Sequence, residues 1–285
     1  MAGGAGARAA GKRGRAPPAS TTRRPAGAPT AGMGASQPDV STAGSDEVPL
    51  VAGIMPGNRV LIIGCNAVWR ELAREVTAKG ATVVAIDKSS GSVARASSTG
   101  INARRVDAEE LHDLDHFHGM FHAVLTVGTL DGMLRAKIVL EGVHKALVNA
   151  DGACFRGELR GHGSHASLRI AAAAALGRAG VQPPPEPEEG TAAFLPTAND
   201  MVAMLHNAYF RVRECALTPH VAEGDEDDAR EVLLPLIKHV PDAAVRAEVA
   251  ADALALAAPV LRDSHGHWWT VSTRIYFDAN KRRMD

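Results

Sequence analysis

Two residues that could bind a ligand follow apolar runs in the first third of the sequence. Gly64 ends the run VLIIG, and Asp87 ends the run TVVAID 23 positions later. Glycine permits a tight turn, and the backbone N–H groups that open the next helix can hold an anionic group. Both oxygens of a carboxylate accept hydrogen bonds, so Asp87 can bind two neighbouring ribose hydroxyls. Each residue alone is explained as well by a turn glycine or a strand-end cap, but together they favour an adenosine-type ligand.

A second group with chemical capacity lies in the middle of the chain, in the stretch RGHGSH. It offers a cation, two imidazoles and a hydroxyl in a loop made flexible by glycine, from Arg160, His162, Ser164 and His165. Such groups can form ion pairs and hydrogen bonds with a ligand, although each is also typical of a solvated loop or a surface charge. Trp268 is a further candidate, with lid or core packing as the alternative.

The elements that must position these residues alternate between β-rich apolar runs and helical patterns. This rhythm predicts an α/β fold of Rossmann-like type, with a doubly wound, mostly parallel sheet and helices on both faces. Strands are expected at 58–63, 82–87, 102–106, 120–127, 153–159, 209–217 and 268–280, and helices at 71–79, 140–147, 199–208, 228–239 and 243–261. In a sheet of this kind the candidate residues meet at the carboxyl ends of the strands.

Composition excludes several classes of protein. With 285 residues, 46% of them hydrophobic, the chain can bury one sizeable core, and no apolar run approaches the roughly 20 residues that span a bilayer. The three cysteines show no CxxC pairing, which argues against zinc and disulfides and favours a reducing compartment. We therefore expect a soluble cytoplasmic protein that binds no metal, membrane or nucleic acid; the sequence does not indicate its oligomeric state.

The N-terminal segment differs from the rest of the chain. Residues 1–38 hold six basic side chains and no acid, so this part carries +6 and the remainder −7 of the net charge of −1. With almost no large apolar residue, it favours a disordered basic tail over residues 1–45, followed by a domain over 46–285 with a helical cap at about 225–262. A transit peptide to a mitochondrion or plastid and a nucleic-acid-binding arm are the alternatives.

Removal of residues 1–45 is expected to leave folding unchanged, because this segment has no apolar residues to contribute to a core. Thermal melting of the full and shortened chains tests this expectation. A melting temperature lowered by more than a few degrees in the shortened chain would contradict it.

A nicotinamide cofactor is disfavoured by two missing patterns. The turn after residue 63 lacks the glycines of GxGxxG, which bring backbone close to a pyrophosphate. A tyrosine followed four positions later by lysine is also missing, since Tyr209 is followed by Arg213 and Tyr276 by Asn280. The residues therefore point away from a short-chain dehydrogenase.

From about residue 55 to residue 281 the chain resembles the class I S-adenosylmethionine-dependent methyltransferases, and within them the trans-aconitate methyltransferase-like group (methyltransferase types 11 and 25). The motifs that carry the resemblance are PGNRVLIIGC, VVAIDKS, RRVDAEEL and DGACFRGELRGHGSH. The resemblance implies an antiparallel last strand and S-adenosylmethionine as cofactor. The cofactor-binding residues that it implies are Gly64, Cys65, Asn66, Asp87, Lys88, Asp107, Ala108 and Thr126.

The same resemblance implies a methyltransferase that acts on a small molecule, with carboxyl O-methylation of a small organic acid as the specific reaction. No catalytic acid or base is assigned, and the substrate candidates are Arg160, His162, Ser164, His165 and Trp268.

The sequence departs from the family at several positions, among them Asp131 and Gly132, which stand where the family often has His-Trp. Ile62 replaces a common acid, Asn66 and Val68 replace glycines, and His122 replaces a common aspartate. Asn66 tolerates the left-handed conformation better than most residues, whereas a β-branched Val68 opposes close approach of the backbone to a ligand. These changes motivate an alternative, a catalytically degenerate methyltransferase fold that acts as a binding or regulatory partner; another Rossmann-type enzyme also remains open.

Overall fold

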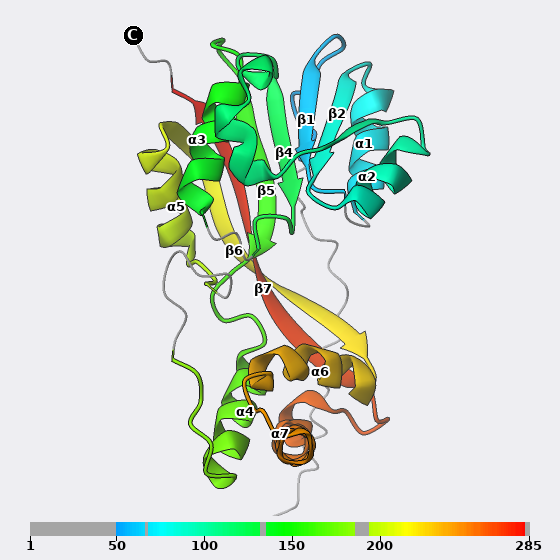
Figure 1. Cartoon of the computed structure of the whole chain (residues 1–285), viewed down its shortest axis with the longest axis vertical. Helices are drawn as coiled ribbons and strands as arrows, with labels where there is room; N and C mark the ends of the chain where they lie inside the picture. The colour runs from blue at the N-terminus through cyan, green and yellow to red at the C-terminus, as the bar shows by residue number, and fades with distance from the viewer. Residues whose placement is uncertain (1–49, 66–67, 132–134, 186–193, 283–285) are drawn as a thin grey trace, which may run out of the picture. The chain divides into compact units, whose positions relative to one another are not determined.

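The computed structural model describes residues 50–65, 68–131, 135–185 and 194–282. Its centre is a seven-stranded sheet in the order β3-β2-β1-β4-β5-β7-β6, in which β7 runs antiparallel to both of its neighbours (Figure 1). The strands are β1 (Arg59–Ile63), β2 (Thr82–Asp87), β3 (Asn102–Arg105), β4 (Ala123–Val127), β5 (Cys154–Arg160), β6 (Phe210–Gly224) and β7 (Trp268–Lys281). The predicted fold class is confirmed; the predicted tail lies outside the described residues.

Helices cover both faces of the sheet and form two apolar layers. On one face, α1 (Trp69–Ala78) and α2 (Ser90–Ser97) pack against alternate residues of β1 and β2, such as Val60 and Val83. On the other face, α3 (Ala136–Ala146), α5 (Ala198–Asn207) and the 3-10 turn η1 (Ala108–Asp113) pack against the intervening residues, such as Leu61 and Ile86. Because side chains alternate across a strand, runs that are apolar throughout become buried on both faces. A second 3-10 turn, η2 (Asp115–Phe117), follows η1.

The last two strands are longer than the hydrophobic pattern indicates. The apolar residues predict that this strand ends at residue 217, but β6 continues to Gly224. The hydrophobic pattern does not reveal the distal half because that half is exposed. Pairing with β7 sustains it, from Phe210 opposite Lys281 to Gly224 opposite Trp268. Since β6 lies at the sheet edge, Pro219 is tolerated within it. Figure 1 shows the two strands running beyond the sheet toward a group of helices.

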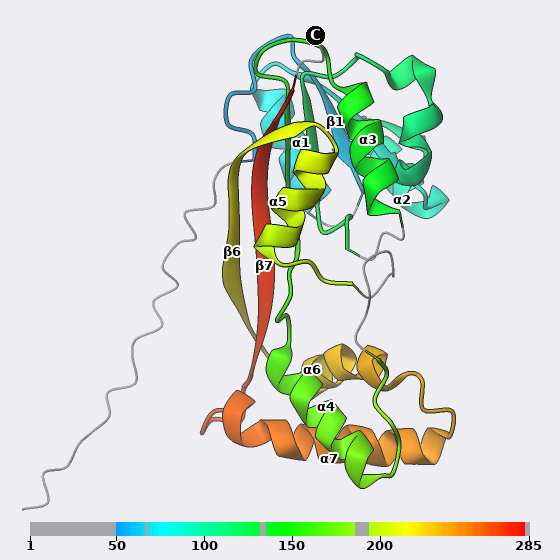
Figure 2. The same cartoon turned by 90° about the vertical axis from the view of Figure 1, so that its left-hand side faces the viewer.

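That group is a helical cap made from three parts of the chain. It consists of α4 (Ala166–Arg178), α6 (Glu226–Leu233) with the 3-10 turn η3 (Leu234–Ile237), and α7 (Ala243–Leu261), which share one apolar cluster (Figure 2). The sequence predicts one helix over 228–239, but Pro235 removes a backbone donor and the α-helix ends before it. The hydrophobic pattern predicts no helix at α4, because alanines surround the helix and hide the periodicity of its buried face.

A buried ion pair links the outer strands to the segment before β1. Nε of Arg156 lies 3.0 Å from Oδ1 of Asp278, and both side chains are at least nine-tenths buried. The guanidinium also donates hydrogen bonds to the carbonyl oxygens of Leu50 and Ala52. None of the described helices is long and apolar enough to cross a membrane.

A buried histidine makes stability depend on pH. Burial, and then the charge of Lys281, lowers the pKa of His144 below its ordinary 6.5. As the pH falls, the unfolded chain therefore takes up a proton at this residue before the folded chain does, so the free energy of unfolding decreases. Urea denaturation at about pH 7 and about pH 5.5 is expected to show this loss, and His144→Gln should reduce it. Equal losses in both proteins would contradict the assignment to His144.

Candidate functional site

The carboxyl ends of β1 and β2 bring Gly64 and Asp87 together. The backbone N–H of Cys65 donates to Oδ2 of Asp87 at 2.8 Å, and that of Ser89 donates to Oδ1 at 2.7 Å. Each carboxylate oxygen accepts about two hydrogen bonds, so the half-buried Asp87 is fixed in orientation and keeps one acceptor site on each oxygen. This is an arrangement suited to two adjacent hydroxyl groups.

Gly64 has a positive φ of 97°, which explains the glycine at the end of β1. A Cβ at this position would overlap Oγ1 of Thr129, in the loop after β4. The two loops therefore meet closely, and Thr129 is a site residue that the sequence analysis missed. A threonine after a strand carries no pattern that would have revealed it.

The residues after β3 complete this edge of the sheet. Asp107 caps η1, with Oδ1 accepting from the N–H of Glu109 at 3.1 Å, and the next residue, Ala108, is buried. The backbone N–H of Val106 binds the carbonyl oxygen of Asp87, which holds the two acids at neighbouring strand ends. Lys88 beside them is exposed.

Other predicted cofactor residues are placed differently. Thr126 is fully buried within β4, and its hydroxyl has no hydrogen-bond partner among the described residues, so a ligand cannot reach it without rearrangement. The thiol of Cys65 lies in an apolar layer, where burial, with Asp87 adding to it, raises its pKa to about 11. It is therefore a neutral packing group, and only its backbone contacts the site. Asn66 lies outside the described residues.

The residues that depart from the family pattern lie in different structural environments. Ile62 is buried in the apolar layer below α1. Val68 has φ of −78° in the helical region and a side chain that is 53% exposed, so its backbone does not require glycine. His122 lies at the opposite, amino edge of the sheet, where its Nδ1 accepts from the N–H of Arg59. The histidine therefore has no direct place in the candidate site.

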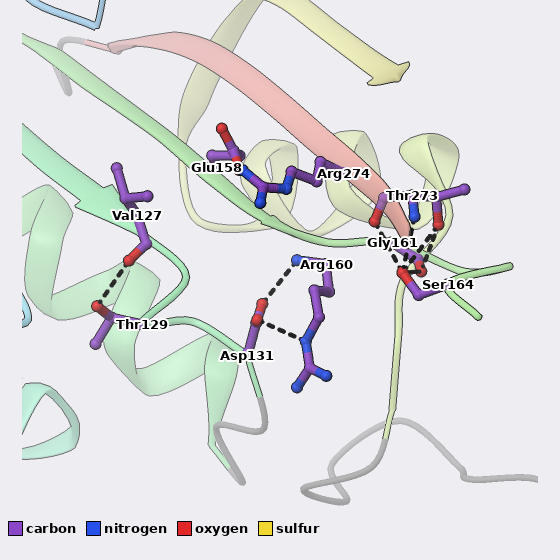
Figure 3. A network of polar contacts seen from close by, with 9 residues as sticks. All are labelled: Val127, Thr129, Asp131, Glu158, Arg160, Gly161, Ser164, Thr273 and Arg274. Atoms are coloured by element: carbon purple, nitrogen blue, oxygen red, sulfur yellow. Dashed lines mark hydrogen bonds and ion pairs between the residues drawn. The ribbon is translucent and has the colours of Figure 1, made fainter. Parts of the chain in front are cut away.

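A charged clamp joins the end of β5 to the loop after β4. Asp131 accepts from the backbone N–H of Arg160 at 2.7 Å and from its Nε at 2.8 Å (Figure 3). The carboxylate is 12% exposed and the arginine side chain 52%. Figure 3 shows the two terminal nitrogens of Arg160 directed away from Asp131, which leaves them available to a ligand.

Beyond Arg160 lies a cavity of about 550 Å³, called here the cap cavity. It opens between the end of β5, the distal part of β6 and β7, and helices α4 and α6. Its lining includes Arg160, Ser164, His165 and Trp268, so four of the five predicted substrate residues meet around one space. Pockets of a few hundred Å³ are of the size that holds small molecules.

Two of the predicted substrate residues connect the loop to neighbouring segments. The Ser164 hydroxyl bonds to Gly161 and Thr273, accepting from the N–H of Thr273 at 3.1 Å, so it ties the loop to β7. Exposed His162 does not line the cavity; its backbone N–H binds Pro196. Trp268 is buried in the cap cluster and forms part of the cavity wall.

His165 is placed differently from the other loop residues. It begins α4 in the left-handed region, with φ of 55°, and its Nδ1 is buried without a hydrogen-bond partner in the described part of the chain. Burial, and then the charge of Arg160, lowers the pKa of His165. The ring is therefore neutral near pH 7 and presents no charge to the cavity.

The acidic side of the cavity was not anticipated from the sequence. Glu223, Asp225, Asp228 and Glu231 line it, and all four are exposed. The run EGDEDD has the pattern of a solvated helix start, and Asp225 does cap α6 by accepting from the N–H of Asp228 at 3.0 Å. The described ranges contain no cluster of three or more metal-ligating side chains.

Comparison with known proteins gives the fold. No protein-family profile and no curated protein sequence matches the chain. A "putative methyltransferase" from Bacillus halodurans C-125 is similar in structure, with 15% identity, a TM-score of 0.54, and coverage of 84% of this chain and 100% of its own. The chain has the Rossmann-like fold of that protein. The YcgJ protein from Bacillus subtilis is also similar, at 12% identity and a TM-score of 0.51, covering 83% of this chain and 97% of its own.

Proposed function

We propose that the chain is an S-adenosylmethionine-dependent methyltransferase that acts on a small molecule. The observation that carries this proposal is the Asp87 carboxylate, which two backbone N–H groups orient at the end of β2 with one acceptor site left on each oxygen. A ribose offers two adjacent hydroxyl donors that match these sites.

The remaining residues of this edge fit the other parts of that cofactor. Asp107 and the backbone of Ala108 would lie beside the adenine ring, and the turn after β1 at Gly64 beside the methionine part. The Thr129 side chain lies close to Gly64 at this turn. When bound, S-adenosylmethionine supplies a methyl group on a positively charged sulfur, whose carbon–sulfur bond breaks with its electrons going to sulfur as an acceptor oxygen bonds to carbon.

The proposed reaction is methylation of a carboxylate oxygen. A carboxylate needs no general base, because it is already an anion at neutral pH, and methylation releases no proton. Arg160 would orient it through the terminal nitrogens that the Asp131 clamp leaves available, and the clamp fixes the arginine beside the loop that carries Thr129. Trp268 and the cap helices would exclude water from the acceptor.

Calorimetric titration of the full chain with S-adenosylmethionine and with S-adenosylhomocysteine tests the proposal. We expect saturable binding with one site per chain. Absence of detectable binding at millimolar ligand would overturn the enzymatic assignment.

That absence would favour the second candidate, a methyltransferase fold that acts only as a binding partner. Two residues favour it. Ile62 packs in the core of β1, where relatives carry an acid, and Thr129 lies so close to Gly64 that it narrows the turn where a methyl donor would rest.

A further inference from the structure

The lining of the cap cavity carries both signs of charge. Its cations are Arg160, at the end of β5, and Arg169, in the first turn of α4. Its carboxylates are called here the acidic wall, defined as Glu223, Asp225, Asp228 and Glu231, which lie on β6, on α6 and at the turn between them. Apolar side chains, including Trp268 and Leu236, complete the lining. The two signs of charge therefore come from different elements, and a ligand that bears both signs can meet a partner for each.

Most of these charges have partners within the protein. Asp131 neutralises Arg160, Asp225 and Asp228 cap α6, and Glu223 lies 3.1 Å from Nδ1 of His267. Arg169 and Glu231 differ, because among the described residues neither forms an ion pair or a side-chain hydrogen bond. Thus the lining holds one cation, Arg169, and one carboxylate, Glu231, that the described residues leave uncompensated.

We propose that the cap cavity binds a zwitterion whose carboxylate lies against Arg160 and Arg169 and whose ammonium group lies against the acidic wall. The orientation is argued from the elements that carry the charges, since Arg160 is clamped to the loop beside Gly64 whereas the acidic wall belongs to β6 and α6. The carboxylate is therefore the end near the proposed methyl donor. Calling this ligand the substrate rests on the proposed function; the binding itself does not.

Charge explains why a simple acid is not the preferred ligand. Four carboxylates face two arginines in the lining, and one of those arginines is already paired with Asp131. A plain anion would meet net negative charge at its far end, whereas a cationic end would be attracted there. Walls of low dielectric strengthen both effects inside a cleft.

The test uses three probes of equal length: 6-aminohexanoate, hexanoate and hexylamine, titrated into the full chain without cofactor and followed by NMR. We expect 6-aminohexanoate to bind at least about tenfold more tightly than either singly charged probe, since each end makes a charge-assisted contact. Equal affinity of hexanoate would show an anion site, equal affinity of hexylamine a cation site, and no binding of any probe no site of this kind. Each of these three results would overturn the proposal.

Two charge-removing variants assign the ends. Arg169→Gln is expected to weaken 6-aminohexanoate and hexanoate and to leave hexylamine unchanged, whereas Glu231→Gln should weaken 6-aminohexanoate and hexylamine and leave hexanoate unchanged. Glu248→Gln, which removes an exposed acid of α7 outside the cavity lining, is the matched control. The reverse pattern, or a uniform loss with all probes, would contradict the orientation. Since cofactor titration is separate, zwitterion binding without cofactor binding would refute the proposed function and keep this inference.

Discussion

Asp87→Ala is expected to weaken S-adenosylmethionine binding by about 1 to 3 kcal/mol, a roughly 5-fold to 150-fold increase in Kd. The carboxylate is a charged acceptor for hydroxyl donors at the end of β2, and its two oxygens are already aligned by the N–H groups of Cys65 and Ser89. Removal of the side chain leaves the ribose hydroxyls without this acceptor. Calorimetry on both proteins measures the change.

The same substitution also frees two backbone N–H groups, so its effect on binding must be separated from an effect on folding. Asp87→Asn keeps one oxygen acceptor and the shape of the side chain, and it should show an intermediate Kd with a melting temperature nearer that of the original protein. Asp115→Ala removes a fully exposed carboxylate and is the matched control, with no expected change in Kd. If Asp87→Ala binds the cofactor as well as the original protein does, Asp87 is only a strand-end cap.

Asp278→Ala is expected to lower the free energy of unfolding by about 3 to 5 kcal/mol. The substitution leaves the guanidinium of Arg156 buried without its counter-charge. The other side chain paired with Asp278 is Arg213, which is itself a cation and cannot neutralise Arg156. Breaking a buried pair by removing one partner costs more than the pair contributes, because the remaining charge loses its hydration. Urea denaturation monitored by circular dichroism measures the loss.

Two comparisons make this expectation specific. Asp252→Ala breaks the ion pair with Arg178, whose side chains are 36% and 60% exposed, and should cost at most about 1 kcal/mol. The double variant Arg156→Met with Asp278→Ala should recover part of the stability, because it removes both buried charges. A cost for Asp278→Ala no greater than that for Asp252→Ala would contradict the buried-pair interpretation.

The two signs of charge in the lining give the cavity a physical basis for selectivity. An arginine that is held by Asp131 loses little conformational freedom when it binds a carboxylate, because its orientation is already fixed. The acidic wall is more exposed, and its attraction both adds to the affinity for a ligand with a cationic end and selects which end of that ligand it holds. This orientation brings the acceptor carboxylate to the end near the proposed methyl donor.

The sequence by itself determined the sheet and its carboxyl-edge residues. Runs such as VLII and VVAI are apolar at every position, which is typical of strands buried on both faces, and Asp87 follows directly from the end of such a run. The sequence predicts the helix at 243–261 with its observed bounds, because a mostly apolar, alanine-rich pattern of that length, interrupted only by Arg246, Glu248 and Asp252, favours a helix. The local sequence pattern was sufficient to predict an element wherever the burial of that element requires a run of apolar residues.

Only the tertiary structure decided which residues form the cap cavity and which do not. Arg169 lies in an alanine-rich helix with no apolar stripe, and Glu231 follows a run of acids that is typical of a solvated surface. Their meeting depends on the extension of β6 and β7, whose distal residues pair through backbone hydrogen bonds rather than through buried side chains. The contact between Thr129 and Gly64 is likewise set by two loops that meet in space. Such relations join residues distant in the chain, and a local hydrophobic period carries no information about them.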